Sequence, residues 1–295
     1  MVAQQSEGGT VVVGVAEAER QDEVVHFAAE EAALRGSRLR ILHAVEWPMP
    51  PGTRREGEPA SFVERAERVV EPLQALVARE FPGVGVSPDL VSGSPAPALL
   101  DRSSEAALIV VGHRGAGGFA RLPLGSVSWQ VATHAECPVV VVRPRDAGQP
   151  KENRVVVGVD LPDMRPDVMH FAIEAARTRR AVLEVVYAAF HPPVLKTGPA
   201  GPAVQDSSAA AGNVREILEQ ALQPYRNENP DIGIRSRIEG GRPAAVLTHA
   251  AGRAELLVVG SHGRTGLKRL MLGSVSAQAL HTATCPVAVL PTKDA

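Results

Sequence analysis

Short, dense runs of aliphatic residues recur along the chain and alternate with longer segments that have a helical pattern of apolar positions. In the first half, these runs predict strands near residues 10–15, 38–45, 85–91, 107–112 and 139–142. The segments between them predict helices near residues 21–35, 61–80, 95–104 and 126–134. The strand segments are nearly continuous in Val, Leu and Ile, which indicates strands covered on both faces. Their alternation with helices predicts a doubly wound α/β fold with a parallel sheet.

The same order of elements occurs a second time. The segment VVVGV occurs at residues 11–15 and again at 155–159, an offset of 144 residues that becomes 148 later in the repeat. We place the four extra residues in the Pro-, Gly- and Ala-rich segment 191–212. We therefore expect two domains, residues 1–147 and 148–295. The strands of the second half are predicted near residues 154–159, 182–188, 232–238, 255–260 and 287–290.

Each half has a glycine-rich segment directly after its fourth predicted strand. The first reads VVGHRGAGGFARLPLGSVS at residues 110–128, and the second reads VVGSHGRTGLKRLMLGSVS at residues 258–276. Both contain Gly-x-x-Gly, nine further residues and Gly-Ser, at a junction where parallel sheets bind ligands. One such segment is equally compatible with close packing alone, whereas two copies in the same frame favour phosphate binding.

The chemistry of these segments suits an anion. Glycine has no Cβ atom, so a phosphate can approach the backbone, and positive φ values are accessible in the turns. We expect Ser126 or Ser274 to cap the following helix, whose free N–H groups favour negative charge. Arginine and lysine side chains within the loops can also reach phosphate or remain solvated.

In these features the chain resembles the universal stress protein family, in its tandem form with two such domains in one polypeptide. The resemblance implies two repeated domains, each a five-stranded parallel sheet of order 3-2-1-4-5 with helices on both faces. It also implies ATP as the ligand in many members, with adenine near the second strand and the phosphates on the glycine loop. Other members lack the loop and bind no nucleotide, so the fold alone does not decide the function.

Carried over to this sequence, the resemblance implies a binding site in each half. Adenine would lie near the backbone of Ala44 in the first half and of Ala188 in the second. The first phosphate loop would consist of Gly112, Gly115, Gly125, Ser126, Val127 and Ser128. The second would consist of Val259, Gly260, Gly263, Gly273, Ser274, Val275 and Ser276.

The two implied sites differ at the end of their first strand. ATP-binding relatives usually have an aspartate there, and the second half has Asp160, which can also simply end the strand. The first half has Ala16 at this place, followed by Glu17. We therefore expect the second site to bind nucleotide more tightly than the first.

Composition excludes several other classes of protein. The formal net charge is −2 and the chain has two Trp, two Tyr and six Phe, which disfavours nucleic acid as a partner. No apolar run approaches the roughly 20 residues of a membrane span, and no secretory signal is visible, so we expect a cytoplasmic protein. The histidines lack metal-ligand spacing. Cys137 and Cys285 have equivalent places in the repeat, and we expect them to be structural.

The sequence also limits the chemistry at the loops. The Walker A pattern is absent and no nucleophile stands beside a base, so we assign no catalytic residue. We expect an ATP-binding stress-response protein that uses nucleotide occupancy to set conformation or partner choice. A weak ATPase, with Asp160 helping to hold Mg²⁺, is one alternative. An interaction protein with empty loops is another, and AMP or a cyclic nucleotide stays open as the ligand.

The last predicted strand of each half is strongly apolar. Residues 139–142 read VVVV and residues 287–290 read VAVL. The implied strand order places both at a sheet edge, where an exposed apolar strand promotes aggregation. In the stress protein family this edge is where two domains associate about a two-fold axis, so the resemblance implies that these strands pair antiparallel and that the halves form an intramolecular pseudo-dimer. A homodimer of tandem chains remains a further option.

Overall fold

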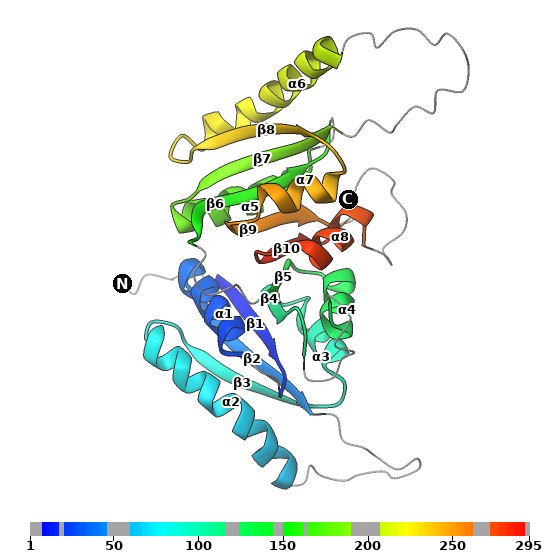
Figure 1. The fold of residues 1–295 in the computed structure, drawn as a ribbon. Helices are drawn as coiled ribbons and strands as arrows, with labels where there is room; N and C mark the ends of the chain where they lie inside the picture. The colour runs from blue at the N-terminus through cyan, green and yellow to red at the C-terminus, as the bar shows by residue number, and fades with distance from the viewer. Residues whose placement is uncertain are drawn as a thin grey trace, which may run out of the picture.

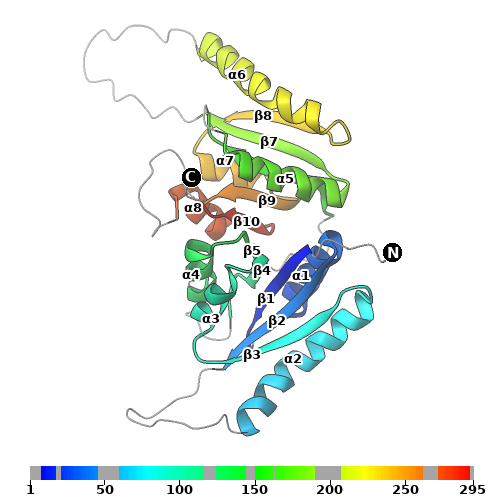
Figure 2. The same ribbon diagram turned by 180° about the vertical axis from the view of Figure 1, so that it is seen from behind.

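The chain folds around one continuous ten-stranded sheet, which Figures 1 and 2 show from opposite sides. The computed structural model describes residues 8–17, 21–45, 60–115, 124–143, 150–161, 164–189, 207–261 and 272–292. The N-terminal half forms one end of the molecule and the C-terminal half forms the other (Figure 1).

The described residues of each half contain the elements that the apolar pattern predicts. In the first half, the strands are β1 (Gly8–Val15), β2 (Ser37–Val45), β3 (Val86–Ser92), β4 (Ala106–Gly112) and β5 (Val139–Val142). The helices are α1 (Gln21–Arg35), α2 (Ala60–Glu80), α3 (Pro95–Arg102) and α4 (Ser126–His134). In the second half, the strands are β6 (Glu152–Val159), β7 (Val182–Ala189), β8 (Ile234–Gly240), β9 (Ala254–Gly260) and β10 (Val287–Leu290). The helices are α5 (Pro166–Arg179), α6 (Ser207–Glu228), α7 (Pro243–Ala250) and α8 (Ser274–Thr282).

The strand order is β3-β2-β1-β4-β5-β10-β9-β6-β7-β8, which confirms the order 3-2-1-4-5 and its repetition in the second half. Neighbouring strands within each half are parallel. β5 and β10 are antiparallel, with Val141 opposite Val287 and Val139 opposite Val289. The expected pairing of the two last strands is therefore confirmed, and it joins both halves into one sheet.

Helices cover both faces of the sheet, as the continuous apolar strands predict. One face packs against α1, α2, α5 and α6 around buried side chains such as Val13 and Leu183. The other packs against α3, α4, α7 and α8 around side chains such as Ile109 and Leu257. Each hydrophobic cluster contains residues of both halves, so the core is continuous across the junction of β5 and β10.

Buried charges reinforce this junction on the side of α1 and α5. The carboxylate of Glu31 is 1% exposed and accepts hydrogen bonds from Arg179 of α5 and, at 3.0 Å, from Nε of Arg35. The guanidinium of Arg35 lies 5.2 Å from the ring centroid of Phe171, a cation–π contact between the halves. Removing Glu31 would leave two largely buried guanidinium groups without this carboxylate, which is strongly destabilising.

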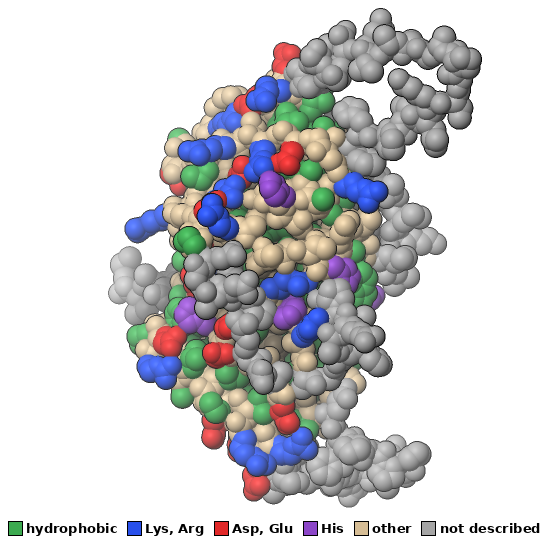
Figure 3. All heavy atoms as spheres, in the orientation of Figure 1, with side chains coloured by type: hydrophobic (Ala, Val, Ile, Leu, Met, Phe, Trp, Pro, Cys, Tyr) green, Lys and Arg blue, Asp and Glu red, His purple; other side chains and the backbone are tan. Residues whose placement is uncertain are grey.

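Surface charges of both signs lie interspersed on the face shown in Figure 3. Within the second half, charged side chains pair along the strands, as Arg237 does with Glu239 at 2.7 Å. Arg154 of β6 likewise pairs with Glu184 of the neighbouring strand β7. These pairs neutralise charge locally on the polar positions of the sheet.

Candidate functional site

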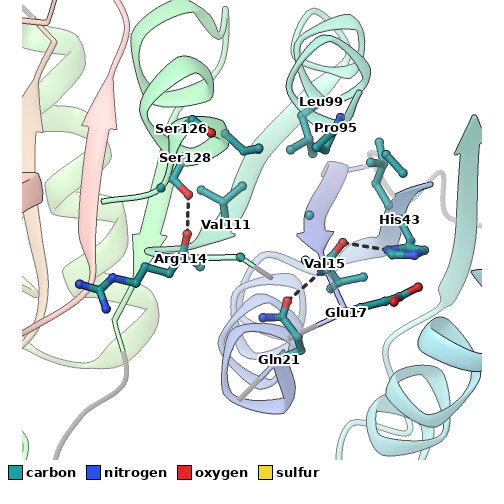
Figure 4. A pocket seen from close by; sticks show the side chains of 18 of the residues that line it. Val15, Glu17, Gln21, His43, Pro95, Leu99, Val111, Arg114, Ser126 and Ser128 are labelled. Carbon is teal, nitrogen blue, oxygen red and sulfur yellow. Dashed lines mark hydrogen bonds between the residues drawn. The ribbon is translucent and has the colours of Figure 1, made fainter. Parts of the chain in front are cut away.

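A cavity of about 420 Å³ opens at the carboxyl ends of β1, β2 and β4 in the first half (Figure 4). Its volume lies within the range of about 300–1,000 Å³ that is usual for small-molecule sites. In the order β3-β2-β1-β4-β5, the chain reverses direction of winding between β1 and β4, which is where open α/β sheets bind ligands. The cavity therefore lies where the fold predicts a site.

The N-terminus of α4 forms one wall of this cavity. Gly125 is the N-cap residue, with φ −73° and ψ 153°, and the helix begins at Ser126. The expected cap by Ser126 is therefore wrong, because this side chain belongs to the first helical residue. The N–H groups of Ser126, Val127 and Ser128 have no acceptor within the helix, since the first turn of an α-helix provides none. These groups and the helix dipole make this wall attractive to an anion.

A chain of hydrogen bonds holds the glycine loop against the sheet. The N–H of Gly125 donates to the carbonyl of His113 at 2.7 Å, and the N–H of His113 donates to the carbonyl of Val142 at 2.8 Å. Ser128 is 4% exposed, and its hydroxyl donates to the carbonyl of Gly112 at 2.6 Å. The Ser128 hydroxyl thus holds the start of the loop at the end of β4, and its proton is used in this hydrogen bond.

The loop glycines provide space, and the expectation of positive φ is wrong for those that the structure describes. The described glycines with positive φ are Gly36, Gly93 and Gly241, none of which belongs to either glycine-rich loop. A Cβ atom on Gly112 would instead lie 3.2 Å from the side chain of Val24. Close approach of α1 to the end of β4 therefore explains this glycine.

The opposite wall of the cavity is apolar. Leu42 and Ala44 come from β2, Leu99 from α3 and Val111 from β4, all of which line the cavity. Ala44 has a small side chain at the end of its strand, opposite Val91 of β3. This wall can accept the flat face of a base, and Ala44 lies where the sequence places it.

The end of β1 carries polar groups that the sequence pattern does not reveal. The N–H of Ala16 donates to Oε1 of Gln21 at 3.1 Å, and Gln21 also lines the cavity. Glu17 pairs with Arg65 of α2 at 3.2 Å, where both side chains are about half exposed. Figure 4 shows Gln21 below the end of β1 and Glu17 near His43. Arg65 reaches the site from a helix far along the chain, which no local spacing predicts.

His43 is a buried residue at the carboxyl end of β2. Its ring is 3% exposed, and Nδ1 lies 3.0 Å from the carbonyl of Val15. This contact ties the carboxyl ends of β1 and β2 together beside the cavity. Among the described residues, Nε2 of His43 has no hydrogen-bond partner.

The second half repeats the loop geometry as far as it is described. The N–H of Gly273 donates to the carbonyl of Ser261 at 2.7 Å, and the buried Ser276 hydroxyl donates to the carbonyl of Gly260. Gly273 is the N-cap of α8, so the expected cap by Ser274 is also wrong. Val275 follows in the first turn of α8. Val259 lies in β9, Ala188 in β7, and Asp160 directly after β6, whereas Gly263 lies outside the described residues.

The potential metal ligands and the two cysteines can be located in the described part of the chain. Within it, no three His, Cys, Asp or Glu side chains come together in a way that could hold a metal ion. Cys137 and Cys285 are both buried, as expected for structural cysteines. Burial raises the pKa of the Cys137 thiol to about 12, which keeps it protonated at neutral pH. No helix in the same residues is long and apolar enough to cross a membrane.

Comparison with known proteins agrees with the repeated loop geometry. The sequence model of the universal stress protein family matches residues 9–143 and again 152–291. The chain belongs to the universal stress protein family. A universal stress protein of Mycolicibacterium smegmatis is 32% identical over 299 residues, with 98% of this chain and 99% of the relative covered. One from Mycobacterium tuberculosis is 33% identical over 291 residues, which is 95% of this chain and 96% of that protein.

A solved universal stress protein from Archaeoglobus fulgidus has the same fold. Its TM-score is 0.68 at 19% identity, and 98% of each chain is covered. The likeness extends over both halves, so this universal stress protein has the tandem architecture throughout.

Proposed function

We propose that this universal stress protein binds adenine nucleotides, with ATP as the principal ligand, and uses their occupancy to set its conformation or its choice of partner. The cavity of the first half carries this proposal, because it combines an apolar wall with an anion-attracting helix terminus. A nucleotide has the same two parts, a flat base and an anionic phosphate chain.

Each wall has a distinct task in this proposal. The base lies against Leu42, Ala44 and Leu99, and backbone groups of β2 recognise its edge. The phosphates accept hydrogen bonds from the first N–H groups of α4, which Ser128 and Gly125 hold in place. Because these donors belong to the backbone, the site is preorganised and its phosphate contacts depend little on side-chain rotamers.

Regulation by occupancy is favoured over turnover. The described cavity contains no nucleophile beside a base, and Glu17, the carboxylate that lines it, already pairs with Arg65. The second half, where Asp160 follows β6, is the place for a weak Mg²⁺-dependent ATPase. A phosphate-release assay with Mg²⁺ on wild type and on the Asp160→Ala variant distinguishes the two functions.

Direct binding tests the proposal. Mass spectrometry of the purified, denatured protein should reveal a co-purifying adenine nucleotide, and calorimetry should show binding of added ATP. The variant Ala44→Leu fills the base wall of the first cavity and should remove one binding event, while Ala188→Leu does the same in the second half. Thermal unfolding monitors the fold of both variants. A wild-type protein that carries and binds no nucleotide would show that the loops serve packing alone.

A further inference from the structure

Arg143 reaches across the junction between the halves, directly beside the first glycine loop. It follows β5, whose last residue Val142 accepts the hydrogen bond from the N–H of His113 at the start of the loop. Its Nη2 donates to the carbonyl of Leu280 in the last turn of α8 at 2.5 Å. A side chain of the first half thus holds the C-terminus of a helix from the second, where a positive charge also complements the helix dipole.

Two further basic side chains converge on the same place. Arg114 lines the first cavity, and Figure 4 shows its side chain pointing away from the apolar wall toward the faint red strands of the second half. Burial and the nearby charge of Arg114 both lower the pKa of Arg143. Burial and the charge of Arg143 likewise lower the pKa of His281 on α8. We name Arg114, Arg143 and His281 the seam cluster.

The seam cluster has a fixed geometry. The His281 ring stacks on Trp129 of α4 with 5.7 Å between ring centroids and 26° between planes. Trp129 itself lies one turn into the helix whose first N–H groups face the cavity, and its N–H donates to the carbonyl of Gly125 at 3.0 Å. The cluster is therefore attached to the anion-binding wall through α4.

The second half does not repeat the cluster. With the offset of 148 residues, Pro291 stands in the place of Arg143, and Thr133 of the first half corresponds to His281. Neither residue carries a charge. The cluster therefore distinguishes the first cavity from the equivalent place in the second half.

The two guanidinium charges of the seam cluster, on Arg114 and Arg143, lie beside a helix N-terminus and create a local positive potential that attracts a multiply charged anion. Guanidinium groups are well suited to phosphate because their donors match its oxygens. We propose that the phosphate end of the first cavity continues onto the seam cluster and that Arg143 makes this site prefer nucleoside triphosphates over monophosphates. This inference rests on the proposed nucleotide binding, and it adds that the site distinguishes nucleotides by the length of their phosphate chain.

The test compares AMP, ADP and ATP on the full-length protein without Mg²⁺. The variant Arg143→Gln keeps an amide donor for the Leu280 carbonyl but loses the charge. Trp129 fluorescence, in a Trp47→Phe background, reports on the first half. Arg177→Gln is the matched control, because it removes one positive charge from a partly exposed side chain of α5 that pairs with Asp231.

We expect Arg143→Gln to weaken ATP binding by about tenfold, the value of one charge-assisted contact, while the affinity for AMP stays unchanged. The control should leave both affinities unchanged, and Arg143→Lys should retain most of the preference for ATP. Equal weakening of AMP and ATP, or no weakening of either, in a variant with a normal unfolding transition would overturn the inference. Absence of any nucleotide binding by the wild type would instead refute the proposed function itself.

Discussion

The buried hydroxyl of Ser128 provides a direct test of how the first loop is held. Ser128→Ala removes the hydrogen bond to the carbonyl of Gly112, whose donor and acceptor are 2.6 Å apart. The side chain is 4% exposed, so water cannot easily replace the lost donor. The perturbation therefore leaves a carbonyl at the base of the loop without its partner.

The expected loss in the free energy of unfolding is about 1–3 kcal/mol, the usual cost of leaving a buried polar group unsatisfied. In a chain of this size, each lost kcal/mol lowers the midpoint of thermal unfolding by about 2–4 °C. Calorimetric or circular dichroism melting measures this shift. Nucleotide affinity should fall as well, because the first N–H groups of α4 are no longer held in register with β4.

Ser126→Ala is the control, because it distinguishes the observed loop from a conventional serine cap. Ser126 is exposed and, among the described residues, its side chain makes no hydrogen bond, so we expect a change of less than about 0.5 kcal/mol. A serine N-cap would lose about 1 kcal/mol on the same substitution. If Ser126→Ala destabilised the protein as much as Ser128→Ala, the assignment of these two residues would be wrong.

Four further outcomes are expected. Burial and Arg143 hold the pKa of His281 below its usual range, so part of the free energy of unfolding that is present above about pH 6.5 is lost as the pH falls. Denaturant titrations should show a larger loss of this free energy toward about pH 5 for wild type than for His281→Gln. The Cys137 thiol, with its pKa raised to about 12, should resist Ellman's reagent until the protein unfolds, and rapid labelling of the native protein would contradict its burial. Val141→Asp places a charge opposite Val287 and should destabilise both halves together by several kcal/mol, whereas Ser87→Asp on the edge strand β3 should be nearly neutral in the same melts. Asp160→Ala should weaken the tighter of two ATP-binding events by about tenfold in calorimetry, and two equal sites in the wild type would count against this assignment.

The elements of this fold follow from the sequence because each buries an apolar pattern of its own. α1 and β5 have the predicted bounds: Gly36 follows the last residue of α1, and Pro138 and Arg143 flank the four valines of β5. The end of α3 was harder to predict: Ser103 turns its N–H and its hydroxyl back to the carbonyl of Leu100, at 3.0 and 2.7 Å, and the helix stops at Arg102. Local hydrogen bonding of this kind leaves no trace in the apolar pattern.

Pairing between distant strands limits the prediction in another way. β8 lies two residues later than expected, because its register is set by β7, with Leu183 opposite Ile234 and Ala189 opposite Gly240. Ile232 instead belongs to the turn after α6, where its N–H donates to the carbonyl of Asn229. A strand boundary that depends on a partner strand cannot be derived from the strand alone.

The candidate site likewise contains some residues that local sequence features predict and others that depend on tertiary packing. The first glycine loop and Ala44 are local features of the sequence, and the described residues of that loop line the same cavity as Ala44. Gln21 and Arg65 enter the site through contacts with Ala16 and Glu17 that depend on how α1 and α2 pack. The expected φ angles of the loop glycines and the expected serine caps were wrong. A sequence motif shows which residues are small, but it does not determine which backbone conformation the loop adopts.

The antiparallel pairing of β5 and β10 determines from which side of the molecule a partner could contact each of the two proposed nucleotide sites. Within each half all strands are parallel, so the carboxyl ends of the strands of the first half lie beside the amino ends of the strands of the second half. The two loops therefore open at opposite ends of the strands, and a partner that binds at one of these ends contacts one loop. α8 runs from one end of the strands to the other, because it starts at the second loop and Arg143 holds its last turn beside the first. Pro291, which stands in the place of Arg143 in the second half, has no side-chain donor with which to hold the last turn of α4 in the same way.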